Sequence, residues 1–360
     1  MIVRPEIRHA IRVFALSILI AGCGIGTAVG PPGSPTLTQP SVSEQAFAAT
    51  VVATIPLDVF PGGPAVGDGA LWFWDDSKGT IVRVDTTTNR VVATIQMGDP
   101  NGTPYGTPKA IAADGRTVWV SDDVDHAVAR IDPATNRIVD LISLVSVAGL
   151  PGPVSPFGLA IDGDVLWVSD FDQGVVLRVD TRAKKVTMVV SNVDHPEGIA
   201  VGSGSVWAVE HRHGSLARID PSSGTIIATV VLPGTGPDVV CGMCVDNVAT
   251  TSGSVWVPLD FGKGVDRVDP STNGVVAQIS LGRVVDSLAI SEGAVWVPRW
   301  DGSIPCTDAG ASLTRIDEAT NVAADVAVVP CAVTVAISGG DVWVGTADAP
   351  NGVTRLKIGP

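Results

Sequence analysis

The sequence has little charge and lacks several features on which whole functional classes depend. Only 17% of its 360 residues are charged, tyrosine occurs once, and 23 basic residues stand against 37 acidic ones, giving a formal net charge of -14. Nucleic-acid binding needs a basic surface for the phosphates, so we expect no nucleic-acid partner. The sequence contains no glycine-rich phosphate loop, and no Ser/His/Asp set can be singled out. Cationic ligands remain compatible with this charge.

Helical patterning is also missing. No segment of useful length with a helical period follows residue 48. The chain is instead 45% apolar, rich in valine, and contains 40 glycines and 26 prolines, which indicates many turns. This composition predicts a β-rich fold with a substantial core rather than a helical or disordered chain.

The first 22 residues have the layout of a signal peptide. Three arginines precede an apolar stretch, 13–20, that is too short to span a membrane. The sequence Leu-Ile-Ala-Gly-Cys at 19–23 resembles a lipobox, the site at which bacterial lipoproteins are acylated and cleaved. We therefore expect a lipid on Cys23 that anchors the exported protein to the bacterial cell membrane or envelope, and residues 23–48 comprise this cysteine and a flexible tether. An ordinary secretory signal with an incidental cysteine is the alternative.

A tryptophan-containing unit recurs along the rest of the chain. The tryptophans are 40–49 residues apart, and each unit has four short stretches of alternating or β-branched residues separated by turn residues. The repeated tryptophans are Trp72, Trp119, Trp167, Trp207, Trp256, Trp296 and Trp343. Four strands per unit of this length are typical of a β-propeller, in which each tryptophan fills the wedge between neighbouring blades. Arg-x-Asp pairs recur in six units, so we interpret them as packing and hydrogen-bonding elements.

The ends of the chain indicate how the ring closes. The last unit ends after a third strand at 353–358 and lacks a fourth, whereas 51–55 has a fourth-strand sequence that matches 91–95 but has no blade before it. Pairing these two ends would remove two exposed strand edges. We predict an all-β fold over 49–360: a seven-bladed β-propeller of four-stranded antiparallel blades, closed by the N-terminal strand 51–55.

The fourth unit carries a resemblance to known proteins. Its stretches Pro196–Ala200, Val206–Glu210 and Ala217–Asp220 resemble the YVTN/NHL-type propellers, including the streptogramin (virginiamycin B) lyase-like group. The resemblance extends over all seven units and implies the propeller fold. It implies little about function, since many binding proteins share this fold.

The lyase-like group provides a residue-level comparison. Its working residues, as the resemblance implies, come from a Glu-x-His-Gly-Ile stretch and from the glutamate that ends Trp-Phe-x-Glu. Glu210 ends the corresponding stretch here, but the first stretch has His195 and Glu197 in exchanged order. The exchange could preserve a metal site, but it argues against the same elimination reaction.

Candidate functional residues are expected on one face of the ring. The loop entering each innermost strand and the loop between strands two and three open on the same side, which we call the top face. Half of the fourteen aligned positions at these loops are acidic. Two long loops, 143–156 and 300–311, are expected to form walls of a pocket there. The candidate ligand-binding residues are Asp122, Asp170, Asp172, Asp246, Asp286, Arg299 and Trp300. The other candidate lining residues are Phe157, Phe171 and Phe261.

The loops of blade four concentrate histidine and carboxylate. The candidate catalytic residues are His195, Glu197, Glu210 and His213, and the candidate ligands of a divalent metal are His195, Glu197, Glu210 and His211. Imidazole with carboxylate suits both metal binding and acid–base chemistry. Alternatively, these are solvated loop residues and carboxylates bonded to strand-end amides. The favoured hypothesis is a monomeric envelope lipoprotein that binds a small molecule, cation or partner protein. A metal-dependent lyase or hydrolase and a structural scaffold are the alternatives.

Four cysteines follow Cys23, an even number in a chain expected to be exported. We predict a Cys306–Cys331 disulfide, because the loop that holds Cys306 should lie beside the entry loop of the next blade. Cys241 and Cys244 would then pair locally or remain a dithiol. A metal or redox site that uses all four thiolates is the alternative.

Overall fold

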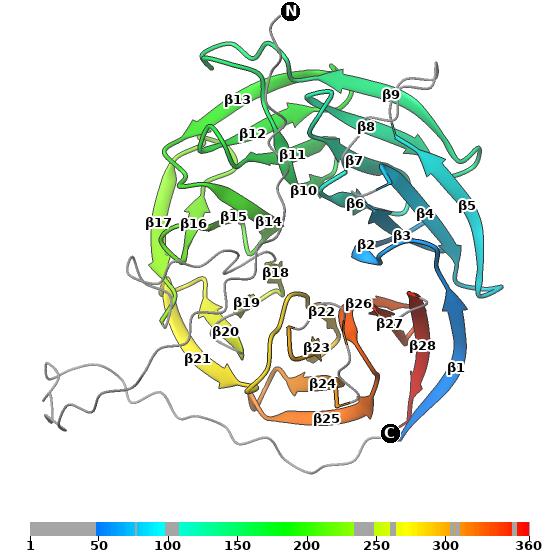
Figure 1. Ribbon diagram of the computed structural model, residues 1–360. Helices are drawn as coiled ribbons and strands as arrows, with labels where there is room; N and C mark the ends of the chain where they lie inside the picture. The colour runs from blue at the N-terminus through cyan, green and yellow to red at the C-terminus, as the bar shows by residue number, and fades with distance from the viewer. Residues whose placement is uncertain are drawn as a thin grey trace, which may run out of the picture. The chain divides into compact units, whose positions relative to one another are not determined.

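The computed structural model describes residues 48–75, 78–97, 108–233, 248–259, 264–302, 306, 310–347 and 351–359. These residues form seven four-stranded antiparallel sheets that follow one another around a ring (Figure 1). The part of the chain described contains no helix. The predicted seven-bladed, all-β propeller is therefore confirmed.

Each of the first six blades uses four consecutive strands, with the innermost strand first. Blade one contains β2 (Gly62–Gly67), β3 (Ala70–Asp75), β4 (Thr80–Asp85) and β5 (Arg90–Gln96), and blade two contains β6 (Ile111–Ala113), β7 (Val118–Asp122), β8 (Ala127–Asp132) and β9 (Arg137–Ser143). Blade three contains β10 (Pro156–Asp162), β11 (Val165–Asp170), β12 (Val175–Asp180) and β13 (Lys185–Ser191), and blade four contains β14 (Pro196–Gly202), β15 (Ser205–Glu210), β16 (Ser215–Ile219) and β17 (Ile226–Val231). Blade five contains β18 (Ala249–Thr250), β19 (Val255–Leu259), β20 (Gly264–Asp269) and β21 (Gly274–Ser280), and blade six contains β22 (Ala289–Ser291), β23 (Ala294–Arg299), β24 (Ser312–Asp317) and β25 (Ala323–Val328).

Blade seven joins the two ends of the described chain. It contains β26 (Ala332–Ser338), β27 (Asp341–Thr346) and β28 (Gly352–Ile358), and its outermost strand is β1 (Ala49–Pro56). β1 pairs antiparallel with β28, from Ala49 opposite Ile358 to Pro56 opposite Gly352. The predicted closure is confirmed, with a strand slightly longer at each end than expected.

The repeated tryptophans form the core between blades, and each has the same partner. Five of the seven are fully buried, and Trp119 and Trp296 are nearly so. In every blade the residue opposite the tryptophan on the innermost strand is alanine: Ala65, Ala112, Ala160, Ala200, Ala249, Ala289 and Ala336. A small side chain suits the innermost strands, because they converge on the axis and leave little room beside a large indole.

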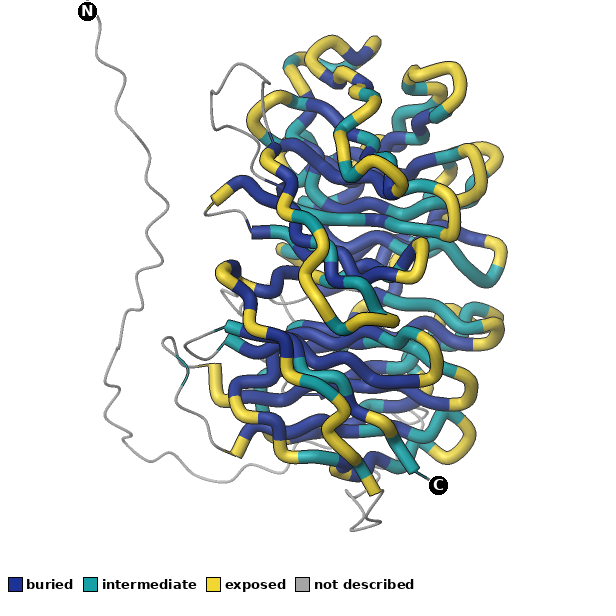
Figure 2. The backbone as a smooth tube through the Cα atoms, turned by 90° about the vertical axis from the view of Figure 1, so that its right-hand side faces the viewer, coloured by how far each residue is buried: buried dark blue, intermediate teal, exposed yellow. Residues whose placement is uncertain are grey.

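The innermost strands surround a central channel. A cavity of about 560 Å³ is lined mostly by small apolar residues of blades one to five, such as Ala65, Ala112 and Ile161. Figure 2 shows buried residues running along the strands and exposed residues gathered at the turns. The apolar strands therefore build the ring and leave the loops to carry polar chemistry.

Arginines join neighbouring blades at the face opposite the top face, where strands one–two and three–four are connected. Arg83 lies over the Trp72 ring at 5.0 Å and donates a 2.9 Å hydrogen bond to Asn136 of the next blade. The same arrangement, which we call the arginine bridge, is made by Arg218 to Asn273, Arg267 to Asn321 and Arg355 to Asn89. Each of these asparagines has a positive φ at its turn, a conformation that asparagine tolerates well. Arg83, Arg218 and Arg267 belong to Arg-x-Asp pairs and Arg355 does not, and all four arginines join one blade to the next.

The aspartates of the same pairs hold the turns. Asp220 accepts hydrogen bonds from the amides of Ser222 and Ser223 and from both serine hydroxyls. These donors lower the pKa of Asp220 to about 2. The structural interpretation of the Arg-x-Asp repeat is confirmed for both of its residues.

Candidate ligand-binding site

Most strand-end carboxylates of the top face have partners inside the protein. Asp170, at the end of β11, is fully buried and accepts hydrogen bonds from the amides of Asp172 and Gln173. Asp122 ends β7 in the same way and accepts from the amide of Asp125 at 3.1 Å. Burial raises the pKa of Asp122 to about 6 and also raises that of Asp170. These two carboxylates shape the loops that follow them, and Asp172 is an exposed residue of one such loop.

The candidate ligand-binding residues of blade six also form hydrogen bonds within the protein. Asp286 accepts a 2.7 Å hydrogen bond from Nε1 of Trp300, and burial raises the pKa of this carboxyl. Arg299 is buried and donates to the carbonyl of Leu281, as well as to Ser312 and Asp325 at the outer strands. Trp300 is 8% exposed, so little of its ring is available to a ligand.

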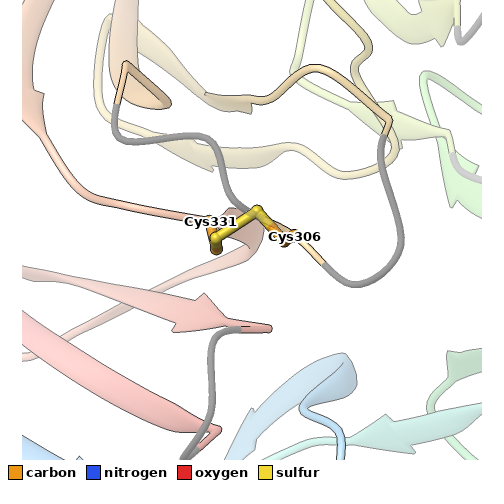
Figure 3. Close-up of a disulfide and its surroundings, with 2 residues drawn as sticks. All are labelled: Cys306 and Cys331. Carbon is orange, nitrogen blue, oxygen red and sulfur yellow. A yellow bond between two sulfur atoms is a disulfide. The ribbon is translucent and has the colours of Figure 1, made fainter.

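A disulfide reinforces this part of the top face. Cys306 and Cys331 are bonded, with Cα atoms 5.8 Å apart, and tie the loop after β23 to the start of β26 (Figure 3). This predicted pairing is confirmed. Several predicted residues lie outside the described part of the chain: Cys23, Cys241, Cys244, Asp246 and Phe261.

Two histidines of blade four, His195 and His213, lie against one carboxylate, that of Asp194. Asp194, immediately before the innermost strand, lies 2.8 Å by Oδ1 from Nδ1 of His195 and 2.6 Å by Oδ2 from Nδ1 of His213. A carboxylate can only accept, so Nδ1 of His195 is the donor in its hydrogen bond to Asp194, and in the neutral ring Nε2 is then an acceptor. The contact with His213 lacks hydrogen-bond geometry at Oδ2 of Asp194. No contact of either Nε2 with another described residue occurs. His195 also has a positive φ of 49°.

A second imidazole–carboxylate pair lies beside the first. Oε1 of Glu197 is 3.1 Å from Nδ1 of His211, and both side chains are largely enclosed, with exposures of 5% and 12%. Oε2 of Glu197 is buried and has no hydrogen-bond partner among the described residues. Glu197 therefore lies within ion-pair distance of His211, in a contact that lacks hydrogen-bond geometry, and its other carboxylate oxygen has no partner among the described residues.

Glu210 supports this arrangement from below. Its Oε1 accepts from the amide of Asp194 at 3.1 Å, and its Oε2 accepts from the hydroxyl of Ser215 at 2.6 Å. Both oxygens are thus occupied, Oε1 in fixing the loop that carries Asp194 and Oε2 at the start of β16. This geometry favours a positioning role for Glu210, which the sequence had suggested as a catalytic base or metal ligand.

Aromatic residues of blade three complete the cluster. The Phe171 ring meets the rings of His195 and His211 edge-on, at centroid distances of 4.9 and 5.4 Å. Phe157 lies 6.1 Å from Phe171. The top-face loops of two blades thus meet in one mixed aromatic and polar cluster. We call it the junction site, and its residues are Phe157, Phe171, Asp194, His195, Glu197, His211 and His213.

Sequence reasoning found most of this cluster but missed its central residue. Asp194 was not singled out, although an acidic residue directly before a loop histidine was a usable signal. His126, by contrast, accompanies a different loop: its Nδ1 lies 2.9 Å from the carbonyl oxygen of Val154. It braces the long 143–156 loop.

The described residues contain no group of three or more His, Cys, Asp or Glu side chains placed to hold a metal ion. Nδ1 of His195 and Nδ1 of His213 both lie against Asp194, whereas Nδ1 of His211 lies against Glu197. The metal hypothesis for His195, Glu197, Glu210 and His211 remains a prediction from the sequence.

Comparison with known proteins extends the description of the fold. No protein-family model and no curated protein matches the sequence. A streptogramin B lyase structure has a TM-score of 0.67 at 15% identity, covering 89% of this chain and 100% of that chain. The WD40 domain of Neurospora crassa Pan2 also has a TM-score of 0.67, at 10% identity, covering 89% of this chain and 98% of that one. The propeller fold is shared. Because a lyase and a WD40 domain match equally well, the likeness does not select an activity.

The structure also bears on membrane association. Among the described residues, no helix is long and apolar enough to cross a bilayer.

Proposed function

We propose that this protein binds a small organic ligand at the junction site. The observation that carries the proposal is the contact of one aromatic ring, Phe171, with two imidazoles of the next blade, each of which has a carboxylate oxygen close to its Nδ1. Apolar walls with a few convergent polar groups are typical of small-molecule sites. The left-handed backbone at His195 adds support, since uncommon backbone conformations of non-glycine residues cluster at functional sites.

Ligand-observed NMR with a set of small aromatic fragments would test this proposal. We expect fragments that show a binding signal with the wild-type protein to show none with the Phe171→Ala and His195→Ala variants. Phe60→Ala is the matched control, because Phe60 is an exposed phenylalanine of blade one outside the junction site. Equal binding to all three variants would place the ligand elsewhere and contradict the proposal.

Acid–base catalysis at the same residues is the second candidate function. It is favoured by the 2.8 Å contact between Asp194 and Nδ1 of His195, which leaves Nε2 as a base. A streptogramin B compound can be incubated with the protein and examined by mass spectrometry. We expect no cleavage, because the histidine and glutamate of the lyase-like stretch are exchanged here. Cleavage by the wild-type protein that is absent with His195→Ala would favour the enzyme over simple binding.

We also propose that the protein is a monomeric lipoprotein of the bacterial cell envelope. The support is the basic and apolar start of the chain and the lipobox-like sequence that ends at Cys23. Mass spectrometry of the protein from its native membrane fraction should find an acylated Cys23 as the first residue. Cys23→Ser should release the protein from the membrane, and sedimentation of the released protein should give the mass of one chain. A wild-type protein in the soluble fraction, cleaved elsewhere, would contradict the anchor.

A further inference from the structure

In its neutral form, His195 presents a hydrogen-bond acceptor to a ligand at the junction site. Its Nδ1 donates to Asp194, so the Nε2 lone pair is available, and Nδ1 of His213 lies 2.6 Å from the other oxygen of the same carboxylate. His213 is 63% exposed and His195 21%, so a ligand can approach both rings from solvent. Acceptors of this kind pair with a ligand that carries N–H or O–H donors.

The charge of the same loops is strongly one-sided. The loops 170–174, 192–197 and 210–214 contain five carboxylates, of which those of Asp170, Glu197 and Glu210 are buried. Arg212 is the only Lys or Arg of these loops, which also hold three histidines. Carboxylates concentrated in a partly enclosed site raise the local concentration of cations. This imbalance favours a ligand with positive charge.

Glu197 provides a separate indication that the charge is not balanced internally. One of its oxygens lies against His211, and the other is buried without a partner among the described residues. Because Oε1 of Glu197 lies 3.1 Å from Nδ1 of His211, this carboxylate acts through its field on a ligand that contacts the His211 ring. A buried charge in such surroundings is felt more strongly than one in water.

The aromatic residues define the rest of the ligand. Phe157 and Phe171 lie 6.1 Å apart, and Phe171 also borders both imidazoles. Aromatic rings combined with carboxylates are suited to organic ammonium groups, which contact the ring faces while the carboxylates supply opposite charge.

We infer that the junction site selects organic cations, namely ammonium compounds with an apolar body. This inference rests on the proposed ligand-binding function and narrows it to one chemical class. It differs from a metal site, since an ammonium group needs acceptors and an aromatic wall but no set of three converging ligands.

Three probes that share a ring and differ in charge test the inference: benzylammonium, benzyl alcohol and benzoate. Each is titrated into the wild-type protein while the ring resonances of His195 and His211 are followed by NMR. We expect benzylammonium to bind about tenfold more tightly than benzyl alcohol, with benzoate weakest, as one charge in a partly enclosed site predicts. Added salt should weaken benzylammonium more than benzyl alcohol.

Variants separate charge from shape. Glu197→Gln should lower benzylammonium affinity by about tenfold and leave benzyl alcohol unchanged, because it removes charge but keeps an acceptor for His211. Asp172→Asn, at an exposed residue, should give a smaller loss and serves if the buried variant does not fold. Glu292→Gln, on an exposed turn of blade six at the opposite face, is the matched control and should change nothing.

The contrary outcomes are distinct. Equal or tighter binding of benzyl alcohol or benzoate, with shifts at the same histidines, would overturn the cation inference and keep the ligand site. Shifts caused by Zn²⁺ but not by benzylammonium would also overturn it, in favour of a metal. If neither these probes nor the fragment set affect the junction site, the proposed function itself fails.

Discussion

Two neighbouring blade boundaries show how one repeat serves two purposes. Between blades four and five, Arg218 lies over Trp207 and donates to Asn273 of the next blade. Between blades three and four, Arg178 instead donates to Thr187 of its own blade, and the turn position of the asparagine is Gly224. The first boundary has the arginine bridge, and the second lacks it.

Of these two boundaries, the one without the bridge carries the junction site at its top face. Gly224 keeps the positive φ of the turn but offers no side-chain acceptor, and a Cβ there would lie 2.6 Å from Sδ of Met188. Packing of Met188 has therefore replaced the polar contact. The repeated contacts secure the ring, and departures from the repeat mark the places where a blade has acquired particular contacts of its own.

The largest expected effect comes from deleting the tryptophan on each side of this comparison. Trp207→Ala and Trp167→Ala should each lower the free energy of unfolding by about 3–5 kcal/mol, because both indoles are fully buried. Trp207→Ala should cost about 1 kcal/mol more than Trp167→Ala. Trp207 also stacks with Arg218 and donates a hydrogen bond to the carbonyl of Gly202, whereas Nε1 of Trp167 has no hydrogen-bond partner among the described residues. Urea denaturation measures both. A larger loss for Trp167→Ala would contradict the importance of the arginine bridge.

The next effect concerns a carboxyl buried at the bridged boundary. Asp266 is fully buried on β20, and neither of its oxygens has a hydrogen bond of normal geometry. It shares a strand face with Val268, which packs against blade four, and the aligned positions of blades one to four are Val82, Ala129, Leu177 and Ala217. Burial raises the pKa of Asp266 to about 7, offset in part by the nearby Gln278 side chain.

This raised pKa predicts that the protein loses stability as pH rises. The folded state keeps the proton up to about pH 7, whereas the unfolded chain releases it near the ordinary value of 3.8, so the stabilisation is complete below about pH 4 and is lost through pH 7. The difference amounts to about 2–4 kcal/mol. Asp266→Asn should flatten the pH dependence of the unfolding free energy between pH 4 and 8. Asp162→Asn, at an exposed turn, should leave it as in the wild type. An unchanged slope with Asp266→Asn would contradict the assignment.

The fold could be predicted from the sequence because every blade repeats the same pattern of strands around one tryptophan. The tryptophan spacing fixed the blade number, and the likeness of 51–55 to 91–95 was enough to predict closure by β1. The alanine opposite each tryptophan was an equally regular signal that went unused. Contacts that recur in every blade require the same residue types at the same spacing, and such a repeat can be recognised in a single sequence.

The site was only partly predictable, for the opposite reason. The acidic residues three positions after the tryptophans of blades one to four were expected to face a ligand, yet Asp122, Asp170 and Glu210 bond to nearby backbone amides. Their recurrence was itself a sign of a structural role, as it was for the Arg-x-Asp pairs. His195 and His211 were recognised by residue type, but the contacts of His195 with Asp194 and of His211 with Glu197 depend on loop geometry that no period encodes.

A smaller effect is expected from the arginines themselves. Arg218→Ala should lower the unfolding free energy by about 1.5–3 kcal/mol, since it removes hydrogen bonds from a charged donor and a stack on Trp207. Arg178→Ala should cost less than about 1 kcal/mol, because its contact is one exposed hydrogen bond within its own blade. Urea denaturation midpoints of the two variants measure the difference between these losses of unfolding free energy. Equal losses would mean that the bridge adds nothing to the packing around it.

The smallest expected effect comes from building the bridge where it is missing. Met188→Ala makes room beside Gly224, and Gly224→Asn in that background supplies the acceptor that Arg178 lacks. The added asparagine should recover about 1 kcal/mol of unfolding free energy, a gain that disappears when Arg178→Ala is also present. Asparagine tolerates the positive φ required at this turn, so its backbone cost there is small. If Gly224→Asn recovers the same unfolding free energy with and without Arg178, the asparagine stabilises the turn itself and forms no bridge to Arg178. The affinity of the junction site for benzylammonium should stay at its Met188→Ala value, because the new bond forms at the face of the ring opposite the loops that hold His195 and Phe171.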